Sequence, residues 1–322
     1  MNITFLGTSS GAPTRQRNVS ATAIQSGRGK DWLLVDCGEA TQHQLLRTRL
    51  SPQKLRAILI THVHGDHCYG LPGLLASCQL GGRTEPLTLV GPAAVWAYVQ
   101  AVIEHTEMRI TYPLEFIEVT DDLNLELSGF HITSASLSHR VACWAYRLEE
   151  LQQQVRLDTA RLAEEGIAPS PLYRRLQQGE RVVLLDGREL NGADYCIQSQ
   201  DSRAVVVGGD NDRPELLADL CQGAQVLVHE ATYTDAVLQR VGPEPQHSSA
   251  AQVARFAQDQ QVPALILTHF SPRYRSEVRR EGELSIDDLR AEALQYYAGA
   301  LYLAEDFETY TLDRQGEVHL VD

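Results

Sequence analysis

The segment His62-Val63-His64-Gly65-Asp66-His67 places three imidazoles and one carboxylate within six residues. Neutral imidazole and carboxylate are ligands that zinc takes in proteins, and a metal site needs three or four such groups to converge. A solvated polar loop is the alternative interpretation. However, so dense a cluster is unusual in a chain that has 11 histidines among 322 residues. The spacing therefore predicts a divalent-metal site.

The residues around this segment indicate how it would present its ligands. An apolar strand pattern over residues 57–60 runs directly into it. Side chains at a strand end repeat every two residues, so His62 and His64 are expected to point the same way. Gly65 is expected to let the backbone turn sharply, so that Asp66 and His67 face a second point nearby. This arrangement favours two metal ions rather than one.

Polar residues also follow several later strand patterns. A single histidine at the end of a strand is usually structural, so each of them is weak evidence alone. Polar residues at the ends of successive strands nevertheless gather at one edge of an α/β sheet. We therefore expect one cluster that contains His62, His64, Asp66, His67, His139, Asp210, Glu230, His247 and His269.

Strand and helix patterns alternate along the chain, which favours an α/β or mixed-sheet fold. No linker separates two independent domains, so one domain is expected over residues 1–322. The patterns predict helices at 41–50, 93–104 and 247–256, and strands at 3–6, 21–25, 32–38, 57–60, 87–90, 114–119, 123–127, 130–136, 204–207, 226–228 and 264–268.

Residues 149–194 differ from the rest, being polar, Pro-rich at 166–171 and poor in strand signals. We interpret residues 150–195 as an insertion that protrudes from the core. It could be a surface excursion that merely packs, or an arm that grips a large partner. Its arginines slightly favour the second interpretation: Arg174, Arg175, Arg181 and Arg188.

Composition restricts the possible partners and location. The chain has 28 Lys and Arg against 42 Asp and Glu, a net charge of −14, which argues against indiscriminate nucleic-acid binding. Only two of the 28 are Lys, and the Arg fork suits bidentate phosphate contacts. Six cysteines without a C-x-x-C pair predict a reduced, cytoplasmic protein. The sequence has no signal-peptide pattern and no run of about 18 apolar residues, so no membrane association is expected.

Several motifs together carry a family resemblance. Besides the histidine segment they are Phe5-Leu6-Gly7-Thr8, Pro13-Thr14-Arg15-x-Arg17-Asn18, Asp36-Cys37-Gly38-Glu39, His229-Glu230-Ala231-Thr232, His247-Ser248 and Thr268-His269-Phe270-Ser271-x-Arg273-Tyr274. With them the chain resembles the metallo-β-lactamase-fold hydrolases and, more narrowly, the ribonuclease Z family of endonucleases. The resemblance implies an αββα sandwich with a protruding helical arm at 150–195.

The resemblance also implies a site and a reaction. One zinc ion would bind His62, His64 and His139, a second would bind Asp66, His67 and His269, and Asp210 would bridge them; other divalent ions are possible. Asp66 would be the general base, and His247, oriented by Glu230, the general acid. The reaction would remove the 3′ trailer of precursor tRNA, leaving a 3′-hydroxyl on the tRNA and a 5′-phosphate on the trailer.

The family's arm grips tRNA, and in a homodimer the arm of one subunit serves the site of the other. The resemblance implies five substrate-binding arginines: Arg15, Arg17, Arg174, Arg175 and Arg273. Departures from the family pattern occur at the arm tip 166–171 and at Ala40, Asn211 and Gln246, none of them a predicted ligand. Two alternatives are a hydrolase of a small ester or phosphodiester, and an RNA-binding or scaffold protein on a decayed hydrolase fold. The arm argues against the first, and the seven retained ligands argue against the second.

Overall fold

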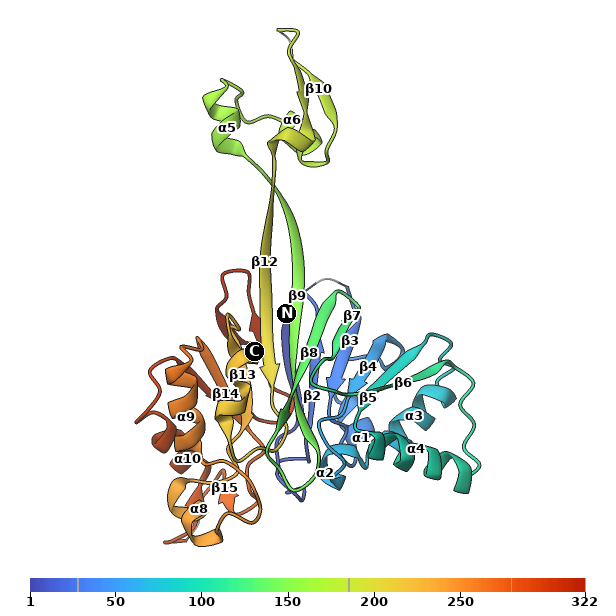
Figure 1. Ribbon diagram of the computed structural model, residues 1–322, viewed down its shortest axis with the longest axis vertical. Coiled ribbons are helices and arrows are strands. Elements are labelled where there is room, and N and C mark those ends of the chain that lie inside the picture. The colour runs from blue at the N-terminus through green and yellow to red at the C-terminus, as the bar shows by residue number, and fades with distance from the viewer. Residues whose placement is uncertain (28, 185, 279, 322) are drawn as a thin grey trace. The chain divides into compact units, whose positions relative to one another are not determined.

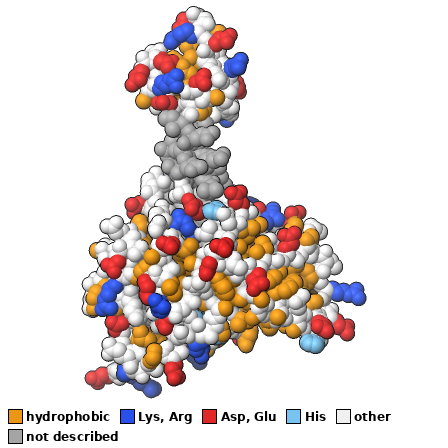
Figure 2. All heavy atoms as spheres, in the orientation of Figure 1, with side chains coloured by type: hydrophobic (Ala, Val, Ile, Leu, Met, Phe, Trp, Pro, Cys, Tyr) orange, Lys and Arg blue, Asp and Glu red, His pale blue; other side chains and the backbone are white. Residues whose placement is uncertain are grey.

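A computed structural model describes residues 1–27, 29–184, 186–278 and 280–321. The chain forms two compact units, which are described separately. The larger unit combines Met1–Glu150 with Arg203–Asp322, and the smaller unit is Leu151–Ser202. Figure 2 shows acidic and basic side chains mixed over the visible face of both units. No helix in the described part of the chain has the length and apolar character needed to span a bilayer.

The first sheet of the larger unit has eight strands in the order β19-β18-β1-β2-β3-β4-β5-β6 (Figure 1). Strands β3 to β6 pair in parallel, and the remaining pairs are antiparallel. The bounds are β1 Asn2–Gly7, β2 Ala21–Gln25, β3 Trp32–Val35, β4 Leu55–Leu59, β5 Leu87–Gly91, β6 Leu114–Glu118, β18 Thr309–Leu312 and β19 Val318–Val321.

The second sheet has seven strands in the order β17-β14-β13-β12-β9-β8-β7. Strands β12, β13, β14 and β17 pair in parallel. Strands β9 and β12 continue from the larger unit into the smaller one. The bounds are β7 Asn124–Leu127, β8 Phe130–Leu137, β9 Cys143–Leu157, β12 Cys196–Val207, β13 Val226–Glu230, β14 Ala264–Thr268 and β17 Ala300–Leu303; a separate short pair is β15 Tyr274–Arg275 and β16 Leu284–Ser285.

The two sheets pack face to face. Alternate residues such as Phe5 of β1, Val35 of β3 and Val228 of β13 meet in the layer between them. Their neighbours, such as Leu34 and Leu227, face outward and lie under helices, so these central strands are apolar on both faces. The larger unit is therefore a helix–sheet–sheet–helix sandwich, as expected.

Helices cover the outer face of each sheet (Figure 1). Beside the first sheet lie α1 Thr41–Leu45, the 3-10 turn η1 Pro52–Lys54, α2 Gly65–Cys68, α3 Leu71–Leu80 and α4 Ala93–His105. Beside the second lie η3 Pro214–Leu217, α7 Ala218–Cys221, α8 Asp235–Val241, α9 Ala250–Asp259 and α10 Ile286–Ala293. The predicted helix at 247–256 begins later than expected, because Ser249 is its N-cap in a capping box with Gln252. His247 is thereby left in the preceding loop.

The smaller unit contains more strand than the sequence predicts. Its elements are α5 Thr159–Glu164, α6 Leu172–Gln177, a hairpin of β10 Arg181–Val183 and β11 Glu189–Asn191, and η2 Gly192–Tyr195. It has a small core of its own, formed by Leu162, Ile167, Leu176, Val182, Leu190 and Tyr195. The expectation of a helical insertion with few strands was therefore incomplete. Strand β9 extends to Leu157 through a polar segment that lacks the apolar alternation by which a strand is recognised.

Candidate metal centre

The histidine segment lies directly after β4. His64 is extended, and α2 begins at Gly65, so Asp66 and His67 sit in its first turn. His62 and His67 are buried, whereas His64 and Asp66 are partly exposed. Gly65 does not adopt a positive φ; the change of direction comes from the passage from extended His64 into the helix. The loop thus presents its ligands in two groups.

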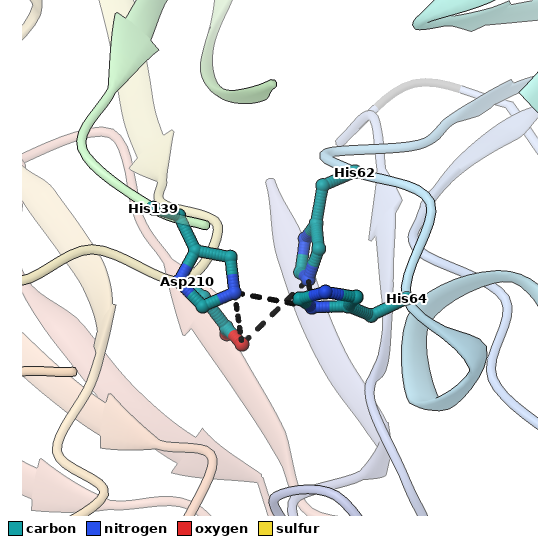
Figure 3. Close-up of side chains that lie close together, drawn as sticks. All are labelled: His62, His64, His139 and Asp210. Atoms are coloured by element: carbon teal, nitrogen blue, oxygen red, sulfur yellow. Dashed lines mark hydrogen bonds and ion pairs between the residues drawn. The ribbon is translucent and has the colours of Figure 1, made fainter. Parts of the chain in front are cut away.

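The first group gathers residues from three strand ends (Figure 3). His64 Nδ1 lies 3.1 Å from His62 Nε2 and 3.1 Å from His139 Nε2. His139 follows β8. Asp210, which follows β12, places Oδ2 3.7 Å from His62 Nε2 and 3.8 Å from His139 Nε2. These four ligand atoms surround one point.

The second group surrounds a neighbouring point. His67 Nε2 lies 3.1 Å from Nε2 of His269, which follows β14. Asp66 Oδ2 is 3.5 Å from the first of these nitrogens and 3.3 Å from the second. Asp210 Oδ1 is 3.4 Å from each. Asp210 therefore offers one carboxylate oxygen to each group.

The donor atoms fit divalent ions. Tetrahedral zinc with bonds of 2.0–2.1 Å separates its ligands by about 3.3–3.4 Å, close to the separations in both groups. Asp210 Oδ1 is buried without a hydrogen-bond partner among the described residues. Burial raises the pKa of Asp210, but the neighbouring imidazoles, His269 foremost, outweigh this effect and hold the pKa well below its usual range. A buried, ionised and unsatisfied carboxylate oxygen calls for a cation.

The other ring nitrogens of two ligands are held by acceptors. His67 Nδ1 donates to Asp36 Oδ2 at 2.6 Å, and His139 Nδ1 donates to the carbonyl oxygen of Gln246 at 3.0 Å. A carboxylate and a carbonyl can only accept, so Nδ1 carries the proton. In both rings the lone pair is therefore on Nε2, which faces the cluster.

Two threonine hydroxyls have the same effect on two further rings. Thr61 Oγ1 donates to Asp36 and lies 3.0 Å from His62 Nδ1. Thr232 Oγ1 donates to Glu230 and lies 3.1 Å from His269 Nδ1. A hydroxyl has one proton, and since a carboxylate takes it, the oxygen accepts from the imidazole. Asp36, Thr61 and Thr232 were not predicted as site residues; Asp36 ends a strand pattern as the ligands do, but no local signal connects it to His67.

His247 lies beside the cluster. Its Nδ1 is 2.9 Å from Glu230 Oε1 and 3.8 Å from Asp210 Oδ2. His247 also lies close enough to His269 and Asp210 for the three side chains to bind one metal ion. In His247, unlike His67 and His139, the nitrogen that the contacts place toward Asp210 is Nδ1 itself; this atom donates to Glu230, which favours a hydrogen-bonding role over a ligand role. Burial lowers the pKa of His247, but the carboxylates of Glu230 and Asp210 outweigh it and raise the pKa to about 9.

Glu230 is 2% exposed and is fixed by the backbone. The N–H of Asn211 donates to Oε1 and the N–H of Thr232 to Oε2, each at 3.1 Å. In the second group of ligands, the N–H of Gly11 donates to Asp66 Oδ2 at 2.7 Å. Both carboxylates are thus oriented by main-chain donors.

The five predicted substrate-binding arginines do not form one group. Arg17 is 8% exposed and donates through Nη1 to Thr8 Oγ1 and to the carbonyl of Ala304. The Arg17 guanidinium is therefore engaged in hydrogen bonds inside the fold, which is a structural position rather than a surface position for binding substrate. Arg15 and Arg273 are exposed on the larger unit, and Arg273 lies 5.3 Å from the Tyr233 ring. Arg174 and Arg175 are exposed on α6 of the smaller unit, where Arg175 pairs with Glu180.

Comparisons with known proteins match the whole chain. Ribonuclease Z of Marinobacter nauticus is 51% identical over 323 residues, which cover 100% of this chain and 99% of that protein. Human tRNase Z, short form, shares the fold with a TM-score of 0.66 at 23% identity, over 97% of this chain and 99% of that one. The metallo-β-lactamase fold protein YhfI from Bacillus subtilis has a TM-score of 0.65 at 20% identity, over 96% of this chain. A family model described as anti-Pycsar protein Apyc1 matches residues 1–139. The predicted metallo-β-lactamase fold is confirmed.

Proposed function

The chain belongs to the ribonuclease Z family, and from this premise we propose that it is an endoribonuclease that removes the 3′ trailer from precursor tRNA. The products are a 3′-hydroxyl on the tRNA and a 5′-phosphate on the trailer. The observation that carries the chemistry is the double cluster in which Asp210 offers one oxygen to each group of ligands. Such a site suits hydrolysis of a phosphodiester, whose negative charge must be neutralised.

We propose that two zinc ions fill the site, one on His62, His64 and His139 and the other on Asp66, His67 and His269. When bound, the ions supply positive charge against the phosphodiester and a nucleophile at neutral pH. Asp66 takes the proton of the attacking water as general base. Its carboxylate is suited to this role because the Gly11 N–H fixes its orientation.

His247 is the proposed general acid. The leaving 3′-oxygen needs a proton, and the Glu230 contact on Nδ1 leaves Nε2 of His247 to donate it. Exposed Arg273, next to Tyr233, and Arg15 supply positive charge for neighbouring phosphates on the larger unit.

We further propose that residues 150–195 act as an arm that grips tRNA through Arg174 and Arg175, and that the protein is a cytoplasmic homodimer. Two strongly exposed leucines on the larger unit, Leu46 after α1 at 83% and Leu80 on α3 at 88%, are apolar side chains that a second copy would cover. The described cysteines are all free thiols, in keeping with a reducing compartment.

Cleavage of a 3′-extended precursor tRNA with mapped product ends tests the proposal, beside a small chromogenic phosphodiester. The arm is removed by replacing residues 159–194 with a short Gly-Ser linker. This junction is short because the Asp158 N–H already donates to the Tyr195 carbonyl at 2.7 Å. We expect the arm deletion to abolish precursor cleavage and to spare the small ester, and Asp66→Ala to abolish both. Turnover of the small ester without any cleavage of the precursor would overturn the tRNA assignment.

A further inference from the structure

A cavity of about 550 Å³ on the larger unit has an unusual lining. Four cationic residues surround it, namely Lys30, Arg47, Arg49 and Lys54, and its lining contains no Asp or Glu. Lys30 and Lys54 are the only lysines of the chain. In a protein of net charge −14, both lysines and two arginines thus surround one hollow.

The cavity is built on the outer face of the eight-stranded sheet. Ile3 and Phe5 of β1 point into the layer between the sheets, so Asn2 and Thr4 point outward, where they line the cavity. The Thr4 hydroxyl is 2.8 Å from that of Thr309 on β18. The floor is therefore a polar, hydroxyl-bearing stretch of sheet.

One cation of the lining is held in place by a ring. The Arg47 guanidinium carbon lies 3.8 Å from the centroid of the Phe307 ring, which also lines the cavity. This cation–π contact restricts the side chain without neutralising its charge. The loop between α1 and η1 supplies Arg49, and η1 itself ends at Lys54. The cations thus come from short, structured segments around the floor.

Little negative charge lies close to the lining: Asp306, which is not part of it, acts electrostatically on Arg47 from beyond ion-pair distance. Among the described residues, none of the four cations has a carboxylate within ion-pair distance. A solvated basic surface would normally interleave both signs, as other exposed arginines of this chain do in the pairs Arg161–Glu165 and Arg213–Glu215. A concave group of like charges repels itself and is relieved by an anion.

We propose that this cavity binds an oligophosphate, that is, two or more adjacent phosphate groups of a free nucleotide or of an RNA strand. Guanidinium forks bind phosphate oxygens in pairs, and ammonium groups add point charges. The volume is that of a small-ligand site. None of the lining residues belongs to the metal cluster, so binding here can be measured whether or not the chain cleaves RNA.

The two lysines make the test direct, because every acetylated lysine reports on this cavity. The full-length protein is treated with a limiting amount of an amine-acetylating reagent, and Lys30 and Lys54 are quantified by peptide mass spectrometry. The probes are sodium tripolyphosphate, ATP and a single-stranded RNA oligonucleotide, all at matched ionic strength. A lysine-containing peptide in the same tube reports reagent loss, and an EDTA sample reports the effect of metal chelation.

We expect at least one phosphate probe to slow acetylation of both lysines severalfold, while EDTA leaves it unchanged. Protection by RNA alone identifies the source as an RNA strand, and protection by tripolyphosphate and ATP alone identifies a free nucleotide. Absence of protection by all three probes would overturn the proposal.

A charge-matched pair of variants separates the cavity from general electrostatics. In Arg47→Gln/Arg49→Gln, the affinity of the protecting probe, read from its concentration dependence, should fall about tenfold or more. Arg213→Gln/Arg240→Gln removes the same charge elsewhere and should leave that affinity unchanged. Equal losses in both variants would mean that the probe senses only net charge, which would also refute a built site.

Discussion

His247 and Glu230 form a directed pair beside the metal cluster: His247 Nδ1 donates to Glu230 Oε1 at 2.9 Å. Glu230 is buried and receives two backbone N–H groups, so the carboxylate cannot turn away. The imidazole is therefore fixed in one orientation, with Nδ1 held by Glu230 and Nε2 on the other edge of the ring. That orientation is what a proton donor to a leaving oxygen requires.

The first prediction concerns the pH profile. Burial lowers the pKa of His247, but Glu230 and Asp210 raise it to about 9. In the metal-loaded protein the cations offset the Asp210 contribution, so the single-turnover cleavage rate should fall as the pH rises between about 6.5 and about 9. Glu230→Gln should move this alkaline limb down toward the ordinary histidine value of about 6.5. His247→Ala should lose about 10²–10⁴-fold on the acidic side of this limb, and the loss should shrink at higher pH, where the native His247 is itself deprotonated. Identical alkaline limbs in the native protein and Glu230→Gln would refute the pairing as the source of the shift.

The second prediction concerns the shared carboxylate. Asp210 faces both groups of ligands, whereas His64 belongs to the first only. Asp210→Ala should therefore weaken both metal positions, and His64→Ala should weaken one. Metal content per chain, measured by plasma mass spectrometry after dialysis, should fall toward zero in Asp210→Ala and by about half in His64→Ala. Equal contents in the two variants would contradict the bridging geometry.

The third prediction concerns Asp36, which touches no proposed metal. Its Oδ2 accepts from His67 Nδ1 and its Oδ1 accepts from the backbone N–H of Thr61. Asp36→Asn keeps the shape but removes the charge that holds the His67 tautomer. We expect a loss of about 10–100-fold in metal affinity in a chelator-competition titration. Asp121→Asn, which changes a carboxylate that binds Ser136 instead, serves as the control and should not alter this affinity.

The fourth prediction separates two neighbouring arginines. Arg17 is buried, donates to Thr8 and Ala304, and lies 5.0 Å from the Phe270 ring, whereas Arg15 is exposed. Arg17→Ala should lower the free energy of unfolding by about 2–4 kcal/mol, because it leaves buried acceptors unsatisfied. Arg15→Ala should leave the free energy of unfolding within about 0.5 kcal/mol and act on substrate affinity instead. Denaturant unfolding of both variants gives the comparison; equal stabilities would show that the Arg17 contacts contribute nothing.

The strands that lead into the smaller unit could not be predicted from the sequence. Strand β9 continues to Leu157 and β12 begins at Cys196, yet neither extension was predicted. Strand signals depend on an alternation of apolar and polar residues, and a polar segment has none.

The start of the helix after His247 was also predicted too early, because its first residues are polar and give no periodic signal. Three polar residues precede the apolar face, and only the bond from Gln252 N–H to Ser249 Oγ identifies which one is the cap.

The sequence by itself determined the ligand types, the local spacing of His62, His64, Asp66 and His67, and the strands that end at the same edge. These features depend on neighbouring residues and on periodicity, which are legible along the chain. Only the tertiary structure decided that Asp210 turns one oxygen to each group, that Asp36 holds His67, and that the carbonyl of Gln246 holds His139. Such contacts depend on sheet register and packing between residues far apart in the chain. A backbone carbonyl, moreover, carries no side-chain identity that a sequence could display.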